Sequence, residues 1–264
     1  MVRPIITLTT DFGLRDPYVA EMKAVILSIC PEVRIVDVSN EIEKFSVKMG
    51  AFVLASASHY FPEDAVHVAI VDPTVGTSRR PLLIRTRKGF FVGPDNGVLA
   101  LAADSCGIER TYEITNRKLM LPRISSTFHG RDIFASAAAH LANGVEPAEF
   151  GPVIREIVRP SFAKIAEKKG ELVGEVLHID GFGNIVTNFR EDELESMNVK
   201  KRVNIKLKRT KLKLKLCKAY AEEKKHRPLA IIGSHDFLEI SVNQGNAART
   251  FKIENGDRVM LYRS

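Results

Sequence analysis

The chain of 264 residues has only three cysteines, Cys30, Cys106 and Cys217, and no C-x-x-C pair. An odd, scattered set of cysteines argues against a disulfide framework and for a reducing compartment. No apolar run approaches the ~18 residues of a transmembrane helix, and the opening MVRPIITLTTDFG has no apolar signal-peptide core. We therefore expect a cytoplasmic protein that does not enter a membrane.

Several motifs for nucleotides and metals are also missing. The sequence has no G-x-x-x-x-G-K-[ST] loop, which disfavours a P-loop nucleotide hydrolase, and no H-E-x-x-H zinc motif. Gly181-Phe182-Gly183 lacks the third glycine of a dinucleotide-binding loop. The seven histidines show no metal-ligand spacing. We expect neither a metal site nor a bound cofactor.

Positive charge is concentrated in one segment. The chain carries +7, whereas residues 200–227 hold 13 Lys/Arg and two acids, or +11, which leaves about −4 elsewhere. Residues 211–216 alternate lysine and leucine, which predicts a strand with one buried and one lysine-bearing face. We interpret it as a solvated or edge-protecting strand, because lysine on a sheet edge blocks unwanted pairing. A nucleic-acid surface is less favoured, since no aromatic residue is interleaved in the strand.

The first part of the chain alternates apolar strands with helices. Asp16 and Pro17 predict a helix start, with Asp16 as N-cap and Pro17 at the first helical position. Strands are predicted at residues 5–10, 33–38, 66–71, 82–85 and 90–92, and helices at residues 17–29, 46–60 and 131–141. This alternation predicts an α/β layered domain with a mostly parallel sheet over residues 1–155.

The sequence pattern changes after Pro160, where predicted strands follow one another closely. They are predicted at residues 175–179, 185–188, 203–207, 212–216, 230–232, 237–242 and 258–262, with one short helix near residues 191–197. Such spacing is typical of a small β-barrel or sandwich. We place this second domain at residues 170–264 and a linker at residues 156–169, which contain a Lys/Glu run.

Polar residues stand where a ligand would bind. Asp11 follows the first strand, Asp72 follows the third with Arg79 seven residues later, and His129 precedes the alanine-rich helix. In open α/β sheets, ligands bind at the carboxyl ends of strands. An acidic residue there can accept hydrogen bonds from a ribose diol, and Asp72 and His129 can hold or move a proton. Each segment alone is also typical of a turn or a helix cap, but together they favour a site.

Six segments occur in order along the chain. They are ThrThrAspPheGly at 9–13, ValAspProThrValGlyThr at 71–77, GlyProAspAsnGly at 93–97, ThrPheHisGlyArgAsp at 127–132, IleAspGlyPheGlyAsn at 179–184 and AsnGlnGlyAsnAlaAla at 243–248. Together they resemble the S-adenosyl-L-methionine (SAM) hydroxide adenosyltransferase family, relatives of the fluorinases and chlorinases. The resemblance covers nearly the whole chain.

This resemblance implies an N-terminal α/β domain, a C-terminal β-barrel and a homotrimer. It implies that SAM binds between the N-terminal domain of one subunit and the C-terminal domain of its neighbour. Water or hydroxide would then attack the ribose 5′-carbon and release adenosine and L-methionine. SAM is the substrate, and no cofactor is implied.

The resemblance also implies roles for individual residues. Asp72, Arg79 and His129 match the family's water-handling triad, and Asp11 matches the aspartate on the ribose hydroxyls. The other substrate-binding candidates are Asp16, Asp180, Phe182, Asn184, Tyr220, Ser234, Glu239 and Val242. Because the sulfonium loses its charge in the transition state, we expect apolar neighbours at sulfur, with Phe45 and Phe128 as candidates.

The halogenating branch differs at the nucleophile position. It carries a tyrosine where Asp72 stands, and fluorinase has a serine at the position of Gly130 and a threonine at that of Val75. A carboxylate would repel a halide by about 4 kcal/mol at 4 Å and an effective dielectric of 20. His235 replaces the arginine that binds the methionine carboxylate, which leaves Ser234 and backbone amides for that group.

Three alternatives to SAM hydrolysis stay open at this point. The first is an enzyme of the same fold that uses a halide or another small nucleophile. The second is a SAM or adenosine sensor with slow turnover, which sequence cannot separate from the enzyme. The third is a nucleic-acid-binding protein that acts through residues 200–227.

Overall fold

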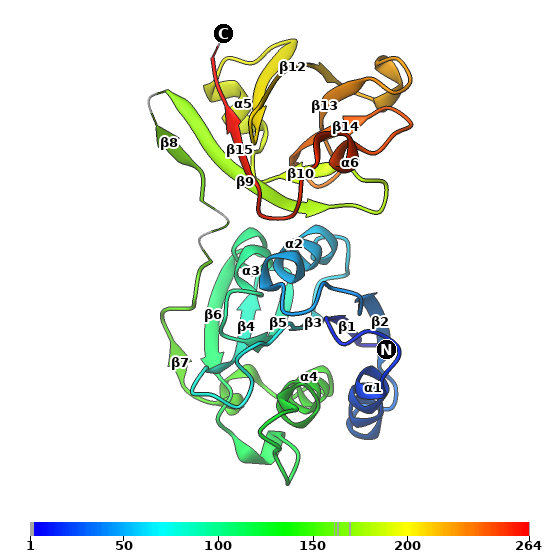
Figure 1. The fold of residues 1–264 in the computed structure, drawn as a ribbon. Coiled ribbons are helices and arrows are strands. Elements are labelled where there is room, and N and C mark those ends of the chain that lie inside the picture. Colours follow the sequence, from blue (N-terminus) through cyan, green and yellow to red (C-terminus); the bar gives the residue numbers. More distant parts are fainter. Residues whose placement is uncertain (1–2, 161, 163, 169, 264) are drawn as a thin grey trace. The chain divides into compact units, whose positions relative to one another are not determined.

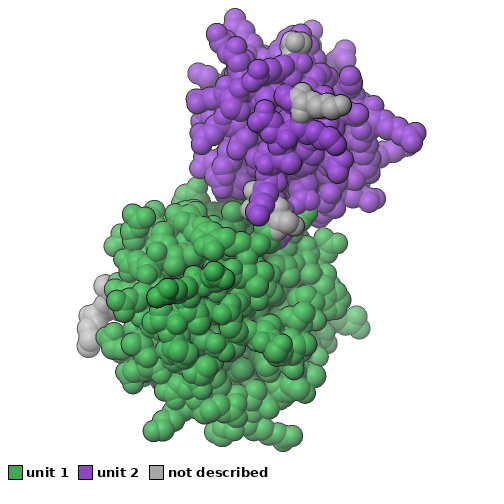
Figure 2. Space-filling model, turned by 90° about the vertical axis from the view of Figure 1, so that its left-hand side faces the viewer, with its two compact units in different colours: residues 1–160 green, residues 161–264 purple. Residues whose placement is uncertain are grey.

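The computed structural model describes residues 3–160, 162, 164–168 and 170–263. The chain divides into two compact units, residues 1–160 and residues 161–264, which Figure 2 shows in green and purple. The division falls within residues 156–169, of which residues 161, 163 and 169 lie outside the described part. In that described part, no helix is long and apolar enough to cross a membrane.

The N-terminal unit is a seven-stranded sheet between two helical layers (Figure 1). The strand order is β2-β1-β3-β5-β4-β6-β7; the first four are parallel, and β4 and β7 run antiparallel to their neighbours. Helices α1 and α4 pack on one face, and α2 and α3 on the other. The elements are β1 (Ile5–Thr10), α1 (Tyr18–Ile29), β2 (Arg34–Ser39), α2 (Val47–Ser58), β3 (Ala65–Ile70), β4 (Pro81–Thr86), β5 (Gly89–Pro94), α3 (Ala100–Cys106), β6 (Ile108–Glu113), α4 (Ser136–Ala142) and β7 (Val153–Ile154). The predicted layered α/β fold is confirmed.

The two long helices of this unit begin differently. Ser46 caps α2, because its hydroxyl accepts a hydrogen bond from the Met49 amide at 3.4 Å. The predicted Asp16 cap of α1 is wrong: Pro17 is the N-cap residue, and no side chain bonds the helix end. The Pro17 carbonyl accepts the first helical bond, from the Glu21 amide at 2.9 Å, so the helix starts one residue later than predicted.

The alanine-rich helix also differs from its prediction. Its first six residues, Gly130–Ala135, form a π-helical turn, and only then does the regular helix α4 begin. Wider turns of this kind often occur at functional sites. The turn starts directly after His129, which is its N-cap residue.

The C-terminal unit is a closed seven-strand barrel, which confirms the predicted fold. The ring runs β10-β14-β13-β12-β11-β15-β9, pairing of β10 with β9 closes it, and β8 adds to β9 outside the ring. The elements are β8 (Ala166–Lys168), β9 (Glu171–Ile179), β10 (Ile185–Thr187), α5 (Glu191–Ser196), β11 (Arg202–Leu207), β12 (Thr210–Cys217), β13 (Pro228–Ile232), β14 (Leu238–Val242), α6 (Ala247–Phe251) and β15 (Arg258–Leu261).

One expectation for this unit is wrong. A second helix, α6, joins α5, because Asn246 accepts a hydrogen bond from the Arg249 amide and caps a helix too short to show a periodic pattern. The lysine strand β12 pairs with β11 along residues 210–215, whereas β13 pairs only with its last two residues, Leu216 and Cys217. Edge protection of the lysine-bearing part therefore remains compatible with the described pairings.

Residues just before the boundary are held to the N-terminal sheet. The buried Asp95 carboxylate binds Arg80 through Nε at 2.9 Å, and it also accepts a hydrogen bond from the Val158 amide at 2.8 Å. Arg80 Nη2 donates to the Glu156 carbonyl at 2.8 Å. Residues 156–158, predicted as linker, thus continue the hydrogen bonding of the first unit.

Stability of this unit should depend on pH through His67 of β3. His67 is 2% exposed, bonds Thr7 Oγ1 through Nδ1 at 2.9 Å and stacks on Phe91. Burial lowers the pKa of His67 to about 4. Below pH ~6.5 the unfolded chain binds a proton that the folded chain excludes, so the free energy of unfolding should fall by about 3 kcal/mol as pH drops to about 4.

Urea denaturation of wild type and His67→Gln across this pH range measures the effect. The variant keeps every other histidine, so the difference between the two slopes belongs to His67. It should be less stable at pH 7 and show a flatter pH dependence; equal slopes would contradict the assignment.

Candidate active site

The first candidate residues emerge from one edge of the N-terminal sheet. β1 and β3 are parallel neighbours, and Thr10 lies opposite Ile70. Asp11 and Asp72 therefore leave the sheet at the same edge, the carboxyl end at which ligands bind in such folds. Asp11 is 6% exposed and has its backbone carbonyl bound by Lys44.

A single guanidinium connects the three residues of the predicted triad. Arg79 donates to Asp72 Oδ2 through Nε at 2.9 Å and through Nη2 at 2.5 Å. The same Nη2 lies 2.9 Å from His129 Nδ1. The Arg79 and Asp72 side chains are only 7% and 5% exposed. Residues 50 positions apart in the sequence thus form one buried hydrogen-bonded cluster.

Two neighbours hold this cluster in place. The Arg79 guanidinium lies over the Phe134 ring, 5.2 Å from its centroid, in a cation–π contact. Gly76 has φ +79°, and a Cβ there would overlap the Ser126 carbonyl oxygen. Glycine at this position therefore lets the loop after Asp72 approach the loop that carries His129.

The cluster fixes how His129 holds its proton. Arginine has only hydrogen-bond donors, so His129 Nδ1 must be the acceptor. Burial and the positive charge of Arg79 lower the pKa of His129, against the opposing charges of Asp72 and Asp132. The neutral imidazole therefore carries its hydrogen on Nε2, which is a donor.

Asp11 and Phe45 form a second group at the same sheet edge. Asp11 Oδ2 accepts a hydrogen bond from the Phe45 amide at 2.9 Å. Phe45 has φ +65°, a conformation that costs energy for a bulky residue, and its ring is 71% exposed. The contact with Asp11 helps to hold this strained residue with its ring toward solvent.

Phe128 packs in an aromatic group beside the triad. Its ring centroid lies 5.7 Å from that of Phe12 and 5.2 Å from that of Tyr18. A Cβ on Gly130 would lie 3.3 Å from atoms of Phe12, Phe128 and Ile70. A larger residue at position 130 would therefore require these neighbours to shift.

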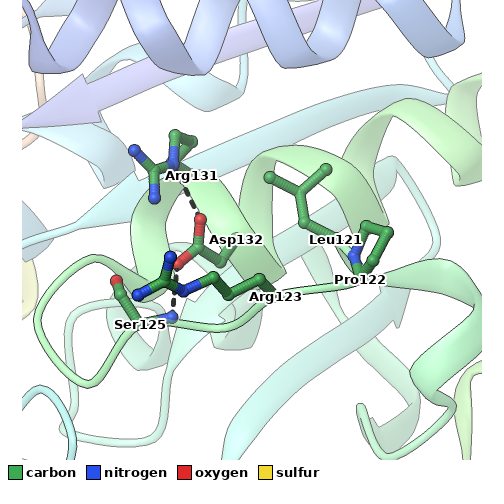
Figure 3. Close-up of a pocket in the computed structure, with 6 residues that line it drawn as sticks. All are labelled: Leu121, Pro122, Arg123, Ser125, Arg131 and Asp132. Atoms are coloured by element: carbon green, nitrogen blue, oxygen red, sulfur yellow. Dashed lines mark hydrogen bonds and ion pairs between the residues drawn. The ribbon is translucent and has the colours of Figure 1, made fainter.

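A cavity of about 560 Å³ opens on the loop before His129 (Figure 3). Its lining residues are Leu121, Pro122, Arg123, Ser125, Arg131 and Asp132. The fully buried Asp132 accepts hydrogen bonds from the Ser125 amide at 2.8 Å and from Arg131 Nε at 2.7 Å. These partners lower the pKa of Asp132 although burial opposes them, so the carboxylate is ionised and anchors the loop.

The C-terminal unit brings a separate set of candidates together. Asp180 is held by its own turn: its carboxylate accepts from the amides of Phe182 at 2.9 Å and Asn184 at 2.8 Å, and from Asn184 Nδ2 at 2.8 Å. Gly183 has φ +85°, and a Cβ there would overlap the Asn246 side chain. The turn therefore lies against the loop of the sixth matched segment and leaves the Phe182 ring 81% exposed.

Glu239 lies near this turn and is 7% exposed. Its Oε2 accepts a hydrogen bond from the Tyr220 hydroxyl at 2.9 Å. Burial chiefly raises the pKa of Glu239, with a further contribution from the charge of Asp180. Burial, together with Glu239, raises the pKa of Tyr220 to about 12, so the phenol stays protonated. A Cβ on Gly233 would overlap Glu239, and the exposed Ser234 follows this glycine in the chain.

Two candidates are placed differently from the rest. Asp16 is exposed ahead of α1, and Val242 is 7% exposed in the apolar core of the barrel. The sequence reasoning missed Lys44, Tyr18 and Phe134, which contact Asp11, Phe128 and Arg79. Phe134 lies within the π-helical turn, and no helical spacing rule predicts that turn. The described residues contain no cluster of three His, Cys, Asp or Glu side chains that could hold a metal ion.

A mostly parallel α/β unit with polar side chains at its strand ends, followed by a closed seven-strand barrel, defines a two-domain class of protein. Within that class, the chain belongs to the SAM hydroxide adenosyltransferase family. Residues 6–151 match the model of the family's N-terminal domain, and residues 174–260 match that of its C-terminal domain. The resemblance stated from the six segments is confirmed.

Individual relatives agree with this assignment. The chain is 38% identical to an (R)-S-adenosyl-L-methionine hydrolase from Methanocaldococcus jannaschii, over 97% of this chain and 95% of the relative. It is 29% identical to a fluorinase from Actinopolyspora mzabensis, over 99% of this chain and 98% of the relative. A crystal structure of an uncharacterized conserved protein from Thermotoga maritima matches with a TM-score of 0.91 and 36% identity, over 98% of this chain and all of that one.

The Asp132 anchor can be tested by Asp132→Asn. The side-chain amide of the variant must point its NH₂ group at one of two donors, the Ser125 backbone amide or Arg131 Nε. The substitution also removes the buried negative charge that faces Arg131. We expect the free energy of unfolding to fall by about 3 kcal/mol, measured by urea denaturation. Arg123→Gln at the exposed rim of the same cavity is the control and should change it by less than about 0.5 kcal/mol. A small, equal effect of both variants would contradict the anchor.

Proposed function

We propose that the chain hydrolyses SAM to adenosine and L-methionine, with the Asp72–Arg79–His129 cluster holding the attacking water. A lone pair of the water oxygen forms a bond to the ribose 5′-carbon. The carbon–sulfur bond breaks, its electron pair neutralises the sulfonium, and one water proton is released. Sulfonium is already a good leaving group, so the task is to orient the nucleophile in line with that bond. The buried three-residue cluster is the observation that carries this proposal.

The hydrogen bonds suggest a division of labour in the cluster. Arg79 occupies Asp72 Oδ2, whereas among the described residues Oδ1 has only a 3.3 Å contact from the Thr74 hydroxyl. Asp72 Oδ1 is therefore our proposed proton acceptor. His129 Nε2 carries a hydrogen and would orient the water oxygen rather than remove its proton. The guanidinium stabilises negative charge that develops on the water.

The substrate-binding roles are proposals on the same footing. Asp11 would accept hydrogen bonds from the ribose hydroxyls, and the exposed Phe45 ring would lie near sulfur. Asp180, Glu239 and their neighbours would hold the methionine end. We further propose a homotrimer in which the barrel of one subunit completes the site of the next. The exposure of Phe45 at 71% and of Phe182 at 81% supports a partner surface over both rings.

Halide transfer is disfavoured by two features of the site. Asp72 would place a carboxylate against the anion, and Arg79 is already neutralised by it at 2.5 Å. Position 130 also has little room for a hydroxyl-bearing side chain, because Phe12, Phe128 and Ile70 surround it. Water is small and neutral and can lose a proton, so it suits this cluster better than a halide does.

Product analysis in isotopic water tests the function directly. Purified protein is incubated with SAM in H₂¹⁸O, with and without added chloride or fluoride, and the products are separated by chromatography. The label should enter the 5′-oxygen of adenosine, and halide should change nothing. Because relatives are named for the (R) form, each sulfonium epimer is assayed separately, and we expect the (R) epimer to react faster. Intact SAM or a halogenated deoxyadenosine would refute the proposal.

Asp72→Asn tests the proposed proton acceptor. The variant keeps the size of the side chain and removes its basicity, so kcat should fall by about 10²–10⁴-fold, with a much smaller change in KM. Asp37→Asn is the matched control, because Asp37 forms an ion pair with Lys23 at the surface of the same unit; it should retain wild-type turnover. Wild-type kcat in Asp72→Asn would contradict the role of the carboxylate.

A further inference from the structure

The outer face of β11 and β12 carries a concentrated positive charge that the proposed hydrolysis does not use. In the antiparallel register, Arg202 lies opposite Lys215, Asn204 opposite Lys213, and Lys206 opposite Lys211. The intervening residues Val203, Ile205 and Leu214 are buried in the barrel. Five of these six outward positions are therefore basic, and none is acidic.

This arrangement is unfavourable for the isolated barrel. Like charges directly opposite each other across two strands destabilise a sheet, and two of the three outward pairs are of that kind. Among the described residues, Arg202, Lys206 and Lys213 have no acidic partner, whereas Lys215 Nζ donates to the Glu222 carbonyl at 2.7 Å and lies 4.0 Å from the Glu222 carboxylate. β13 pairs only with Leu216 and Cys217 at the end of β12 (Figure 1), so protection of the remaining edge accounts for lysine on β12 but not for the basic residues of β11, which has β12 and β15 as neighbours.

Neutral polar and aromatic groups lie among these cations. The Tyr262 ring, just past the end of β15, is 5.4 Å from Lys211 Nζ, and the Tyr262 amide bonds the Asn204 carbonyl. Both side chains are partly exposed. An aromatic ring beside a row of cations is the combination that binds single-stranded nucleic acid, through base stacking and phosphate contacts. The strand sequence alone does not reveal this ring, because it comes from the other end of the unit.

We infer that the outer face of β11 and β12 is a docking surface for single-stranded RNA. Alternate residues along a strand are ~6.8 Å apart and neighbouring strands ~4.8 Å apart, so the cations form two close rows that can follow an extended phosphate backbone. The Asn204 amide and the Tyr262 hydroxyl can each donate and accept, which suits a ribose 2′-hydroxyl.

Two other polyanions fit this face less well. Neither β11 nor β12 contributes a large, strongly exposed apolar side chain that could insert into a membrane. The face is a barrel wall, with no helix or projecting ribbon for the major groove of duplex DNA. Single-stranded RNA is thus the occupant that matches both the charge and the polar groups.

Fluorescence anisotropy with a labelled single-stranded RNA oligonucleotide tests this surface in the full-length protein. Five phosphate contacts predict that log K falls with log salt at a slope of about −3.5. The triple variant Lys206→Gln, Lys211→Gln, Lys213→Gln should bind at least ~10-fold more weakly, with a slope about two units shallower. The control removes the same charge from the other unit through Lys88→Gln, Arg117→Gln, Lys118→Gln, and should bind like wild type.

The remaining outcomes separate the alternatives. Both triple variants should hydrolyse SAM like wild type, which shows that they are folded and that RNA binding is independent of the catalytic proposal. Equal affinity for DNA of the same sequence would overturn the choice of RNA. Absence of wild-type binding, equal loss in the control variant, or binding only to anionic lipid vesicles would overturn the docking surface itself.

Discussion

The proposed catalytic cluster depends on one guanidinium. Arg79 binds Asp72 with two N–H groups and His129 with one, in a cluster whose Asp72 and Arg79 side chains are almost fully buried. Because arginine cannot accept a hydrogen bond or lose its proton, it determines the state of both partners. It keeps one carboxylate oxygen engaged and forces the imidazole to present a donor. The sheet, the loop at Gly76 and the ring of Phe134 all serve to place this group.

A buried ion pair is costly to assemble and strongly destabilising to break, so it is weak evidence for stability alone. Here its members come from two loops at the carboxyl edge of the sheet, where the fold places ligands. That position makes chemistry a better explanation than stability. The second cluster, around Asp132, has the opposite character, since it saturates the carboxylate and fastens the loop that carries His129. Asp72 and Asp132 therefore have different roles, the first in the proposed chemistry and the second in anchoring a loop.

The sequence predicted the layered α/β unit, the barrel and most strands, because their apolar residues recur with clear periods. β6 was missed because three of its six residues are charged. It therefore contains no apolar run that would predict a strand. The start of α1 was misplaced by one residue, since a proline before a helix can be either the cap or the first helical residue. The π-helical turn has no sequence signature of its own. Phe134 lies within this turn and contacts Arg79, so this part of the site required coordinates.

The surroundings of the lysine strand β12 cannot be predicted from the residues of that strand alone. Alternation of lysine and leucine predicted one buried face and one basic face, and the structure has both. Whether such a strand is an edge depends on its partner β13, which pairs only with its last two residues, Leu216 and Cys217. The neighbouring Tyr262 likewise comes from the last strand of the chain. Partners that are far apart in the sequence decide what the lysine face can bind.

The most direct measurement is ¹⁵N NMR of the His129 ring nitrogens at neutral pH and during an acid titration. The account predicts an unprotonated Nδ1, a protonated Nε2, and a pKa below the ordinary histidine value. Protonated Nδ1 at neutral pH, or a pKa above that value, would show that Arg79 does not donate to His129 and would contradict the proposed roles of all three residues.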